Sequence, residues 1–510
     1  MATEQLEIER KFDVDPDFSL PDLSDLPGIG SVLAPVEHQL EAVYFDTADL
    51  RLLRSRITLR RRTGGSDEGW HLKLPADAGG RWERHAPLGR AAGRPPRALL
   101  APVTGVLRGA AVGPVATLRT RRVVTVLEDP EGRALAEVAD DTVAATVAAV
   151  DPAVPAEVHS WREVEAELGA GEGSLLAEVA EALVAAGARP SESASKIGRA
   201  LTTRLAAVRP PDAAGSGRPS AGQVVLDAIG AQVAALEAAD VMVRTERPDA
   251  VHKLRVAARR LRSITAVVRP VLDRTATDPL RAELKWLGGE LAEARDAEVA
   301  LAHLRELVAG EPGELVLGPV AARLQQTALR TAREGQARAV ATLSSDRYLR
   351  LLDGLHLLLG NPPLAGDADR PARPVLRKAV RRAGRRLRRE LAAVESTTGA
   401  ERTTALHAVR KAAKRVRYTG ELAAEVLGRP AKKLVTAMEE VQDVLGEGQD
   451  TSVTRELCRR LGIDAAAAGE NAWTYGRLHA LEQTRAERAD GAFQELAPSL
   501  PRVLRRAAQR

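Results

Sequence analysis

Hydrophobic and polar residues alternate with a period of two along most of the chain up to about residue 205. Because successive side chains of a strand point to opposite faces, this alternation predicts β-strands with one charged and one aliphatic face. The clearest segments are residues 6–12, 57–62, 70–74, 118–127, 134–138 and 161–167. Helical spacing appears instead at residues 173–186, with an apolar stripe formed by Leu175, Leu176, Val179, Leu183 and Val184.

The charged faces differ in sign from strand to strand. Acidic side chains dominate the first and last strands, and basic side chains dominate the strands between them. In chain order, the charged positions are Glu7, Glu9, Lys11, Arg60, Arg62, His71, Lys73, Glu163, Glu165 and Glu167. Near residue 120 the sequence does not determine which side chains share this charged face. Either Arg119 and Arg121 do, or Arg122 alone does, because a β-bulge could reverse the alternation.

Each strand alone fits a two-sided sheet with its charges in water. Taken together, the strands predict a closed antiparallel β-barrel with an ionic lumen, glutamates on one side and arginines and lysines on the other. Enclosed charges are costly unless they are paired, and carboxylates beside an ammonium group suit a divalent cation that carries a phosphate chain. Helices such as residues 173–186 would cover the apolar exterior.

The pattern changes after residues 209–220, a segment rich in Pro, Gly and Ser that predicts a linker. Beyond it, Ala, Leu and Arg recur with helical spacing and the strand signals vanish. Residues 251–263 recur as residues 406–418, and Asp296 recurs as Asp450 at nearly the same separation. The chain is therefore predicted to be α+β, with a duplicated all-helical C-terminal part.

Both copies of the recurring segment carry basic residues along one helical face, with no acidic residue between the histidine and the last arginine. Like charges repel along a helix, so runs this one-sided usually bind a polyanion. Salt bridges to acidic segments such as Glu439-Glu440 are the alternative. A third segment, residues 377–389, is more basic still. The two basic faces are His252, Arg255, Arg259 and Arg262, and His407, Arg410, Lys414 and Arg417.

Composition narrows the class of protein. The 510 residues carry a formal charge of +5 and a single cysteine, Cys458, which excludes an internal disulfide. The charged N-terminal segment does not resemble a signal peptide, and no apolar run reaches the ~18 residues that span a bilayer. We therefore expect a cytoplasmic protein without a membrane partner. Aromatic residues make up only 3%, which offers few platforms for stacking bases and argues against single-stranded nucleic acid. Nucleic acid is therefore not the expected partner, while duplex binding through the phosphate backbone stays open.

The Glu7-x-Glu9-x-Lys11 signature resembles the ExExK motif of the CYTH superfamily, also called triphosphate tunnel metalloenzymes. Leu59–Arg62, Leu72–Pro75, Glu163-x-Glu165 and Ser195-Lys196 follow in that family's order. The resemblance implies an eight-stranded tunnel over residues 1–206 that hydrolyses triphosphate with Mg²⁺ or Mn²⁺. It implies catalytic roles for Glu7, Glu9 and Lys11, and metal binding by Glu7, Glu9, Glu163 and Glu165. The implied phosphate ligands are Lys11, Arg60, Arg62, Lys73, Arg119, Arg121 and Lys196.

The helical part resembles the CHAD domain, a conserved-histidine α-helical domain, through its two His-x-x-Arg helices and residues 441–446. The resemblance implies that basic faces around a central pore bind inorganic polyphosphate. By this likeness the domain covers residues 222–510 after a linker at 207–221, with halves at about 222–360 and 375–510. Its implied polyphosphate contacts are His252, Arg255, Arg259, Arg262, His407, Arg410, Lys414 and Arg417.

The leading hypothesis is metal-dependent hydrolysis of inorganic triphosphate or polyphosphate in the tunnel, with polyphosphate bound by the helical domain. A second hypothesis is a non-enzymatic protein that binds polyphosphate and associates with polyphosphate granules. A third is a CYTH enzyme acting on an organic triphosphate, such as a nucleotide or thiamine triphosphate. Chain-length preference, the metal and the oligomeric state are not determined by the sequence.

Overall fold

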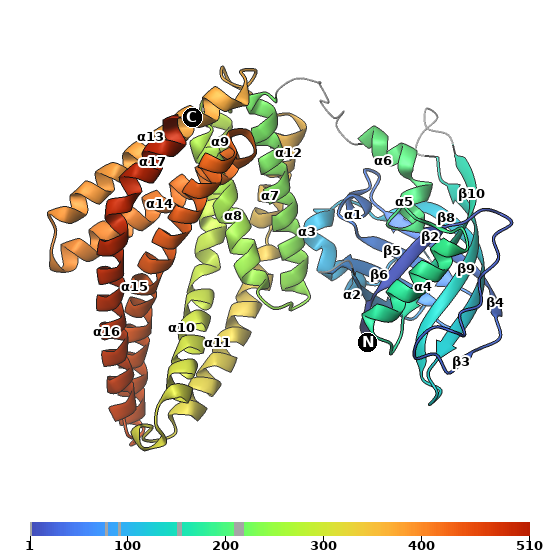
Figure 1. Cartoon of the computed structure of the whole chain (residues 1–510), viewed down its shortest axis with the longest axis horizontal. Helices are drawn as coiled ribbons and strands as arrows, with labels where there is room; N and C mark the ends of the chain where they lie inside the picture. Colours follow the sequence, from blue (N-terminus) through green and yellow to red (C-terminus); the bar gives the residue numbers. More distant parts are fainter. Residues whose placement is uncertain (1–2, 77–79, 90–92, 150–155, 209–218, 510) are drawn as a thin grey trace. The chain divides into compact units, whose positions relative to one another are not determined.

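The computed structural model describes residues 3–76, 80–89, 93–149, 156–208 and 219–509. Contacts divide the chain into two compact units, residues 1–212 and 213–510 (Figure 1). Residues 209–218, which form most of the predicted linker, lie outside the described residues. Among the described helices, none combines the length and the apolar character needed to cross a membrane.

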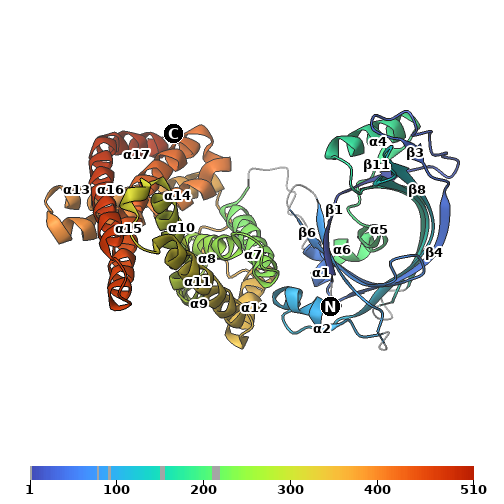
Figure 2. The same ribbon diagram turned by 90° about the horizontal axis from the view of Figure 1, so that it is seen from below.

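The first unit is an antiparallel sheet that curves into a tunnel, seen as a ring in Figure 2. Within the described residues the sheet has eleven strands. They are β1 (Thr3–Glu7), β2 (Glu9–Asp13), β3 (Ser31–Val32), β4 (Val36–Asp46), β5 (Thr58–Thr63), β6 (Gly69–Pro75), β7 (Arg81–Ala86), β8 (Gly113–Glu128), β9 (Ala134–Val147), β10 (Glu157–Leu168) and β11 (Arg189–Pro190).

Among the described residues, the sheet does not close into a continuous ring of hydrogen bonds, so the prediction of a closed barrel is wrong, although the sheet is tunnel-like. The strand order β1-β7-β6-β5-β4-β8-β9-β10-β2-β11 is a path with two ends. The chain itself links the two edges, because β1, which pairs with β7, and β2, which pairs with β10, are separated only by Ile8. Counting β1 and β2 as one strand, and leaving out the two-residue strands β3 and β11, gives the eight strands that the resemblance implied.

Apolar helices cover parts of the outer face, as the alternation of the strands requires. Helix α4 (Gly173–Ala185) buries Leu176, Val179 and Leu183 against outward-facing strand residues such as Val138 and Val164. Burying each such side chain contributes ~1.5–3 kcal/mol. Val184, which we had placed in the same stripe, is instead 47% exposed. Three short helices add further cover: α1 (Arg51–Arg54), α2 (Arg97–Leu100) and α3 (Thr104–Leu107).

Helices α5 (Lys196–Ala200) and α6 (Thr202–Val208) fill one part of the lumen with apolar side chains. Ile197 and Leu201 pack against residues on the inner face of the sheet, including Ala42, Tyr44 and Val143. Ser195 is the N-cap of α5, since its Oγ accepts a hydrogen bond of 3.1 Å from the Gly198 amide. This cap fixes the start of α5, which places Lys196 at the edge of the remaining, ionic part of the lumen.

The second unit consists of helices. In the described residues they are α7 (Ala221–Arg244), α8 (Ala250–Val267), α9 (Arg274–Glu290), α10 (Ala292–Gly310), α11 (Val320–Leu343), α12 (Asp346–Gly360), α13 (Ala372–Glu395), α14 (Gly399–Leu427), α15 (Arg429–Ala467), α16 (Trp473–Leu496) and α17 (Leu500–Gln509).

The duplication predicted from the sequence is visible in the helix boundaries. Helix α15 begins at Arg429 and α9 begins at Arg274, the same separation of 155 residues as between His407 and His252. Helix α15 runs unbroken where the first half has two helices, α9 and α10. One apolar core joins both halves and includes Leu254 and Leu261 of α8 with Val409 and Val416 of α14. The apolar stripes beside the two basic faces are therefore what holds the halves together.

Candidate functional site

Three carboxylates meet inside the tunnel. Asp141 of β9 pairs in register with Glu163 of β10, and Glu165 is two residues further along the same strand. All three are buried, and one carboxylate oxygen from each lies within 4.8 Å of the others. Sequence reasoning assigned Glu163 and Glu165 to a metal site but missed Asp141, although Asp141 follows the alternation of its strand. Three converging carboxylates suit a hard divalent cation such as Mg²⁺ or Mn²⁺.

Lys196 lies among these three carboxylates. Its Nζ is 2.9 Å from Asp141, 2.7 Å from Glu163 and 2.6 Å from Glu165. Burial alone would lower the pKa of Lys196, but the three carboxylates outweigh burial and raise it above the ordinary range. The ammonium group is therefore charged, and it already provides part of the positive charge that the carboxylates require.

Lys11 and Arg122 also contact Glu165. Lys11 forms ion pairs with Glu165 and, at 3.0 Å, with Glu9. Arg122 contacts Asp141 through two nitrogens at 2.8 and 2.6 Å, and Glu165 at 2.6 Å. Despite burial, these cations hold the pKa of Glu165 well below its usual value. Glu165 therefore stays ionised at the centre of the cluster.

On β8, Arg122 faces the lumen, whereas Arg119 and Arg121 do not. Arg119 and Arg121 point out of the tunnel, where they pair with Glu41 at 2.8 Å and Glu37 at 2.7 Å. Their side chains are 76% and 53% exposed. Arg119 and Arg121, predicted as substrate ligands, therefore lie outside the lumen, because β8 keeps its register with β9 from residue 116 to residue 127 and the alternation carries Arg122 inward.

A second acidic group lies at the junction of β1, β6 and β7. Lys73 donates a hydrogen bond to Glu7 and is also 3.6 Å from Glu83. Glu83 lies 2.7 Å from Nδ1 of His71. Burial, together with a hydrogen bond to Glu83, raises the pKa of Glu7 to about 8. Of the four predicted metal ligands, Glu163 and Glu165 thus lie in the carboxylate group with Asp141, Glu9 contacts Lys11, and Glu7 belongs to this second group.

The basic side of the lumen comes from β5 and β8. Arg60 lies 3.5 Å from the Tyr44 hydroxyl, and Arg62 is ion-paired with Asp67. Burial and the neighbouring charges of Arg60 and Arg122 lower the pKa of Arg62 to about 9. Three crowded guanidinium groups repel one another, and an anion with several oxygens would relieve this repulsion.

In the helical unit, the basic faces of α8 and α14 meet. Arg259 of α8 donates a hydrogen bond of 2.6 Å to the hydroxyl of Tyr418 on α14, and Arg417 stacks on the Tyr418 ring at 4.9 Å. Burial, then the charges of Arg410, Arg259 and Arg417, lower the pKa of Lys414 to about 7. Arg410 approaches α15 so closely that a Cβ at Gly446 would lie 3.2 Å from it. This is an accumulation of positive charge between the two halves.

Other residues of the two basic faces lie outside this accumulation or are partly neutralised. Arg255 is 3.1 Å from Asp296, and Arg417 is 3.4 Å from Glu439, so the salt-bridge alternative holds for these two arginines. Arg262 lies near Arg281, and burial and that charge lower its pKa. The two histidines differ, since His252 is exposed and His407 is half-buried. Burial and Lys411 lower the pKa of His407.

Comparisons with known proteins match both units. Residues 5–200 match the CYTH domain and residues 227–459 match the CHAD domain. Two relatives from Mycobacterium tuberculosis, Uncharacterized protein MT2285 of strain CDC 1551 and Uncharacterized protein Rv2226 of strain H37Rv, are each 37% identical over 514 residues, 98% of this chain and 98% of theirs.

Solved structures resemble parts of the chain. PptA from Streptomyces chartreusis is 22% identical with a TM-score of 0.45, covering 54% of this chain and 99% of its own. The CHAD domain from the plant Ricinus communis is 24% identical with a TM-score of 0.44, covering 55% of this chain and 92% of its own. Neither likeness is close enough to inform the chemistry.

The tunnel is that of a triphosphate tunnel enzyme family, whose members act on triphosphates as cyclases or triphosphatases and depend on metal. The chain belongs to the family of proteins in which such a CYTH domain is followed by a CHAD domain.

The raised pKa of Glu7 predicts a pH-dependent stability. Because the folded protein holds this proton more tightly than the unfolded chain, the Glu7 contribution is present below pH 4.5 and is lost as pH rises to about 8. Glu7→Gln should therefore lose less stability over that interval than the parent protein. The measurement is urea unfolding followed by tryptophan fluorescence, with Trp286 and Trp473 replaced by Phe so that the signal comes from the first unit.

Glu181→Gln, which changes an exposed glutamate on α4, is the matched control and should follow the parent. Equal pH dependence for Glu7→Gln and Glu181→Gln would contradict the assignment of a raised pKa to Glu7.

Proposed function

We propose that the tunnel hydrolyses inorganic triphosphate or polyphosphate with Mg²⁺ or Mn²⁺, and that the helical unit binds polyphosphate. The observation that carries the proposal is the division of the lumen into two sides. Asp141, Glu163 and Glu165 gather on one side, and Arg60 and Arg62 supply guanidinium groups to the other. Arg122 lies between the two sides, since it contacts Asp141 and Glu165 while its charge acts on Arg62. Such a lumen suits a polyanion together with a cation.

In this proposal, arginine forks hold the phosphate chain. Arg60, Arg62 and Arg122 match phosphate oxygens in pairs, and Lys11 and Lys73 add point charges. Asp141, Glu163 and Glu165 would hold the metal, with Lys196 moving aside toward the phosphates. The metal, when bound, polarises phosphoryl oxygens and acidifies water.

The chain's own carboxyl groups handle the protons. Water attacks the terminal phosphorus in line with the leaving phosphate, and the bridging P–O bond breaks. An ionised glutamate such as Glu9, whose pKa is lowered by Lys11 against the effect of burial, accepts the proton of the water. Glu7, with its pKa of about 8, is protonated at neutral pH and can donate to the leaving oxygen.

Polyphosphate binding by the helical unit is supported by Lys414. A lysine whose pKa falls to about 7 because of its burial and its arginine neighbours lacks sufficient negative charge around it. A phosphate chain along Arg259, Arg410 and Lys414 would supply that charge. The protein is then expected at polyphosphate granules in the cytoplasm.

A second function is favoured by one observation. Lys196 and Lys11 already neutralise the carboxylates without a metal, so the tunnel could hold polyphosphate and release no product. A panel of tripolyphosphate, long-chain polyphosphate, ATP and thiamine triphosphate, each with Mg²⁺, Mn²⁺ or chelator, separates the two functions. We expect metal-dependent phosphate release from tripolyphosphate, abolished by Glu9→Ala and by Lys11→Ala. Tight binding with no release under any condition would establish the second function instead.

Arg122 and Arg119 offer a matched pair of substitutions on one strand. Arg122→Gln should lower kcat/KM for tripolyphosphate about 100-fold, because a preorganised charge beside the phosphates is lost. Arg119→Gln removes an exposed pair with Glu41 and should stay within about three-fold of the parent. Steady-state phosphate release measures both. Comparable losses in the two variants would mean that the tunnel does not bind substrate through Arg122.

Lys414 should make polyphosphate binding depend on pH. Because an anion favours the charged lysine, affinity should rise as pH falls from about 8.5 to about 6 and Lys414 becomes protonated. Lys414→Arg keeps its charge throughout and should lack this component. Calorimetric titration with long-chain polyphosphate in chelator gives the affinities, and Lys411→Arg, an exposed lysine on the same helix, should behave like the parent. An unchanged pH dependence in Lys414→Arg would exclude Lys414 from the site.

A further inference from the structure

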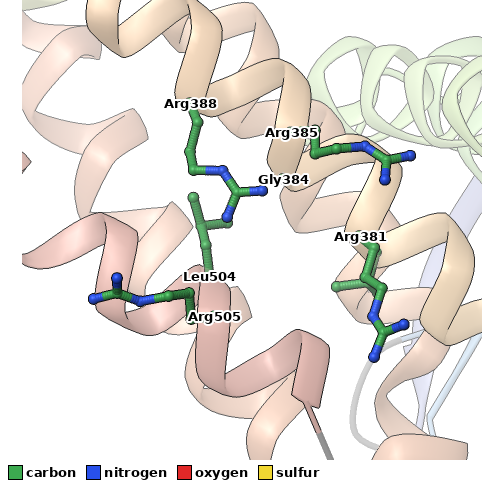
Figure 3. Close-up of a pocket in the computed structure, with 7 residues that line it drawn as sticks. Arg381, Gly384, Arg385, Arg388, Leu504 and Arg505 are labelled. Carbon is green, nitrogen blue, oxygen red and sulfur yellow. The ribbon is translucent and has the colours of Figure 1, made fainter.

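Helices α13 and α17 enclose a pocket of about 270 Å³ that the tunnel and the α8–α14 face do not involve. Figure 3 shows Arg381, Arg385 and Arg388 projecting from one helix, and Leu504 and Arg505 from the other. We name this pocket the α13–α17 groove. Its lining residues are Val380, Arg381, Gly384, Arg385, Arg388, Leu504 and Arg505.

The sequence builds the groove from one helical face. Arg381, Arg385 and Arg388 are spaced i, i+4 and i+7, so they form a row of roughly 10 Å along α13. Gly384 lies between them, and a Cβ there would be 3.3 Å from Leu504, tighter than an ordinary contact. A larger residue would push α17 away, so the glycine lets α17 pack close to α13.

Among the described residues, three of the arginines that line the groove have no ion-pair partner. Helix α13 contains nine basic and two acidic residues, and α17 contains three basic residues and no acidic one. Arg385, Arg388 and Arg505 are exposed, and no described residue forms an ion pair with them. By contrast, Arg386 on another face of α13 lies 3.6 Å from Glu390. Exposed arginines gathered in this way create a local positive potential.

The groove is separate from the basic accumulation between the halves. Arg386 is the α13 residue whose charge reaches α14, where burial and then Arg386, Arg269 and Arg281 lower the pKa of Arg415. One residue corresponds to 100° of helix rotation, so Arg385 points away from that side. Nor does the duplication repeat the groove, because α7, the counterpart of α13, has Arg244 as its one basic residue.

We propose that the α13–α17 groove is a second site for a linear inorganic phosphate chain. Arginine forks pair with phosphate oxygens, and successive charges along such a chain match a row of arginines. Neither α13 nor α17 contains an aromatic residue on which a base could stack, which disfavours single-stranded nucleic acid. Neither carries an exposed large hydrophobic residue that would enter a membrane surface. The inference deepens the proposed function, since it takes the same ligand class but uses none of the same residues.

The test is calorimetric titration of the full chain with tripolyphosphate and with long-chain polyphosphate, in chelator so that hydrolysis is blocked. The groove variant combines Arg385→Gln, Arg388→Gln and Arg505→Gln. The helix α14 variant combines Arg410→Gln, Lys414→Gln and Arg417→Gln. The control combines Arg305→Gln, Arg330→Gln and Arg333→Gln, which removes three exposed charges from α10 and α11.

We expect the groove variant to lose one class of tripolyphosphate site and to bind long chains about ten-fold more weakly, because three charged contacts with the phosphate chain are removed. The control should match the parent, and the α14 variant should keep the groove class. Lysine at the three groove positions should restore part of the binding. A groove variant indistinguishable from the control would overturn the inference.

Other outcomes are equally decisive. Loss of binding to duplex DNA or to phosphatidylserine vesicles, with tripolyphosphate binding unchanged, would overturn the assigned ligand class. If the α14 variant binds like the parent while the groove variant does not, the proposed α8–α14 site fails and the groove stands. If the panel of metals and substrates shows no phosphate release, the proposed hydrolysis in the tunnel fails, but the inference about the α13–α17 groove is unaffected.

Discussion

The tunnel depends on the environment of Glu165. A buried carboxylate without partners would be expelled or protonated, but Lys11, Lys196 and Arg122 approach it from three different elements. Lys11 comes from β2, Arg122 from β8 in the middle of the sheet, and Lys196 from helix α5 in the lumen. The same ion pairs that make the charged interior possible therefore also fix where the N-terminal segment and α5 lie.

Charge serves a different purpose in the helical unit. There the apolar stripes of α8 and α14 bury Leu254, Leu261, Val409 and Val416 and hold the halves together, while the adjoining basic faces are left with few carboxylates. Hydrophobic packing offsets the repulsion among Arg259, Arg410 and Lys414. The tunnel thus neutralises its charges internally, whereas the helical unit keeps an excess that a polyanion can neutralise.

The alternation of charged and apolar residues was sufficient to predict the strands, because neighbouring residues of a strand point to opposite faces of the sheet. It also placed the charged residues on one face: Glu7, Glu9, Lys11, Arg60, Arg62, Lys73, Glu163 and Glu165. It could not predict the phase at Arg119–Arg122, which depends on whether a bulge interrupts β8. It also missed Asp141, whose role appears only when β9 and β10 are set in register. The duplication could be predicted because both basic faces recur in the sequence. The salt bridges of Arg255 and Arg417 could not be predicted, because residue spacing does not specify their neighbours in three dimensions.

The break between β1 and β2 at Ile8 has a consequence for the order in which the first unit folds. Residues 9–13 are synthesised long before their partner strand β10, which ends at Leu168, and Lys196 follows later still. Contacts so distant in sequence form slowly, because a long loop must close first. During synthesis on the ribosome, β1 can pair with β7 early, whereas residues 9–13 must stay without their partner until β10 has emerged. The β2–β10 pairing is therefore a late event in the folding of the first unit.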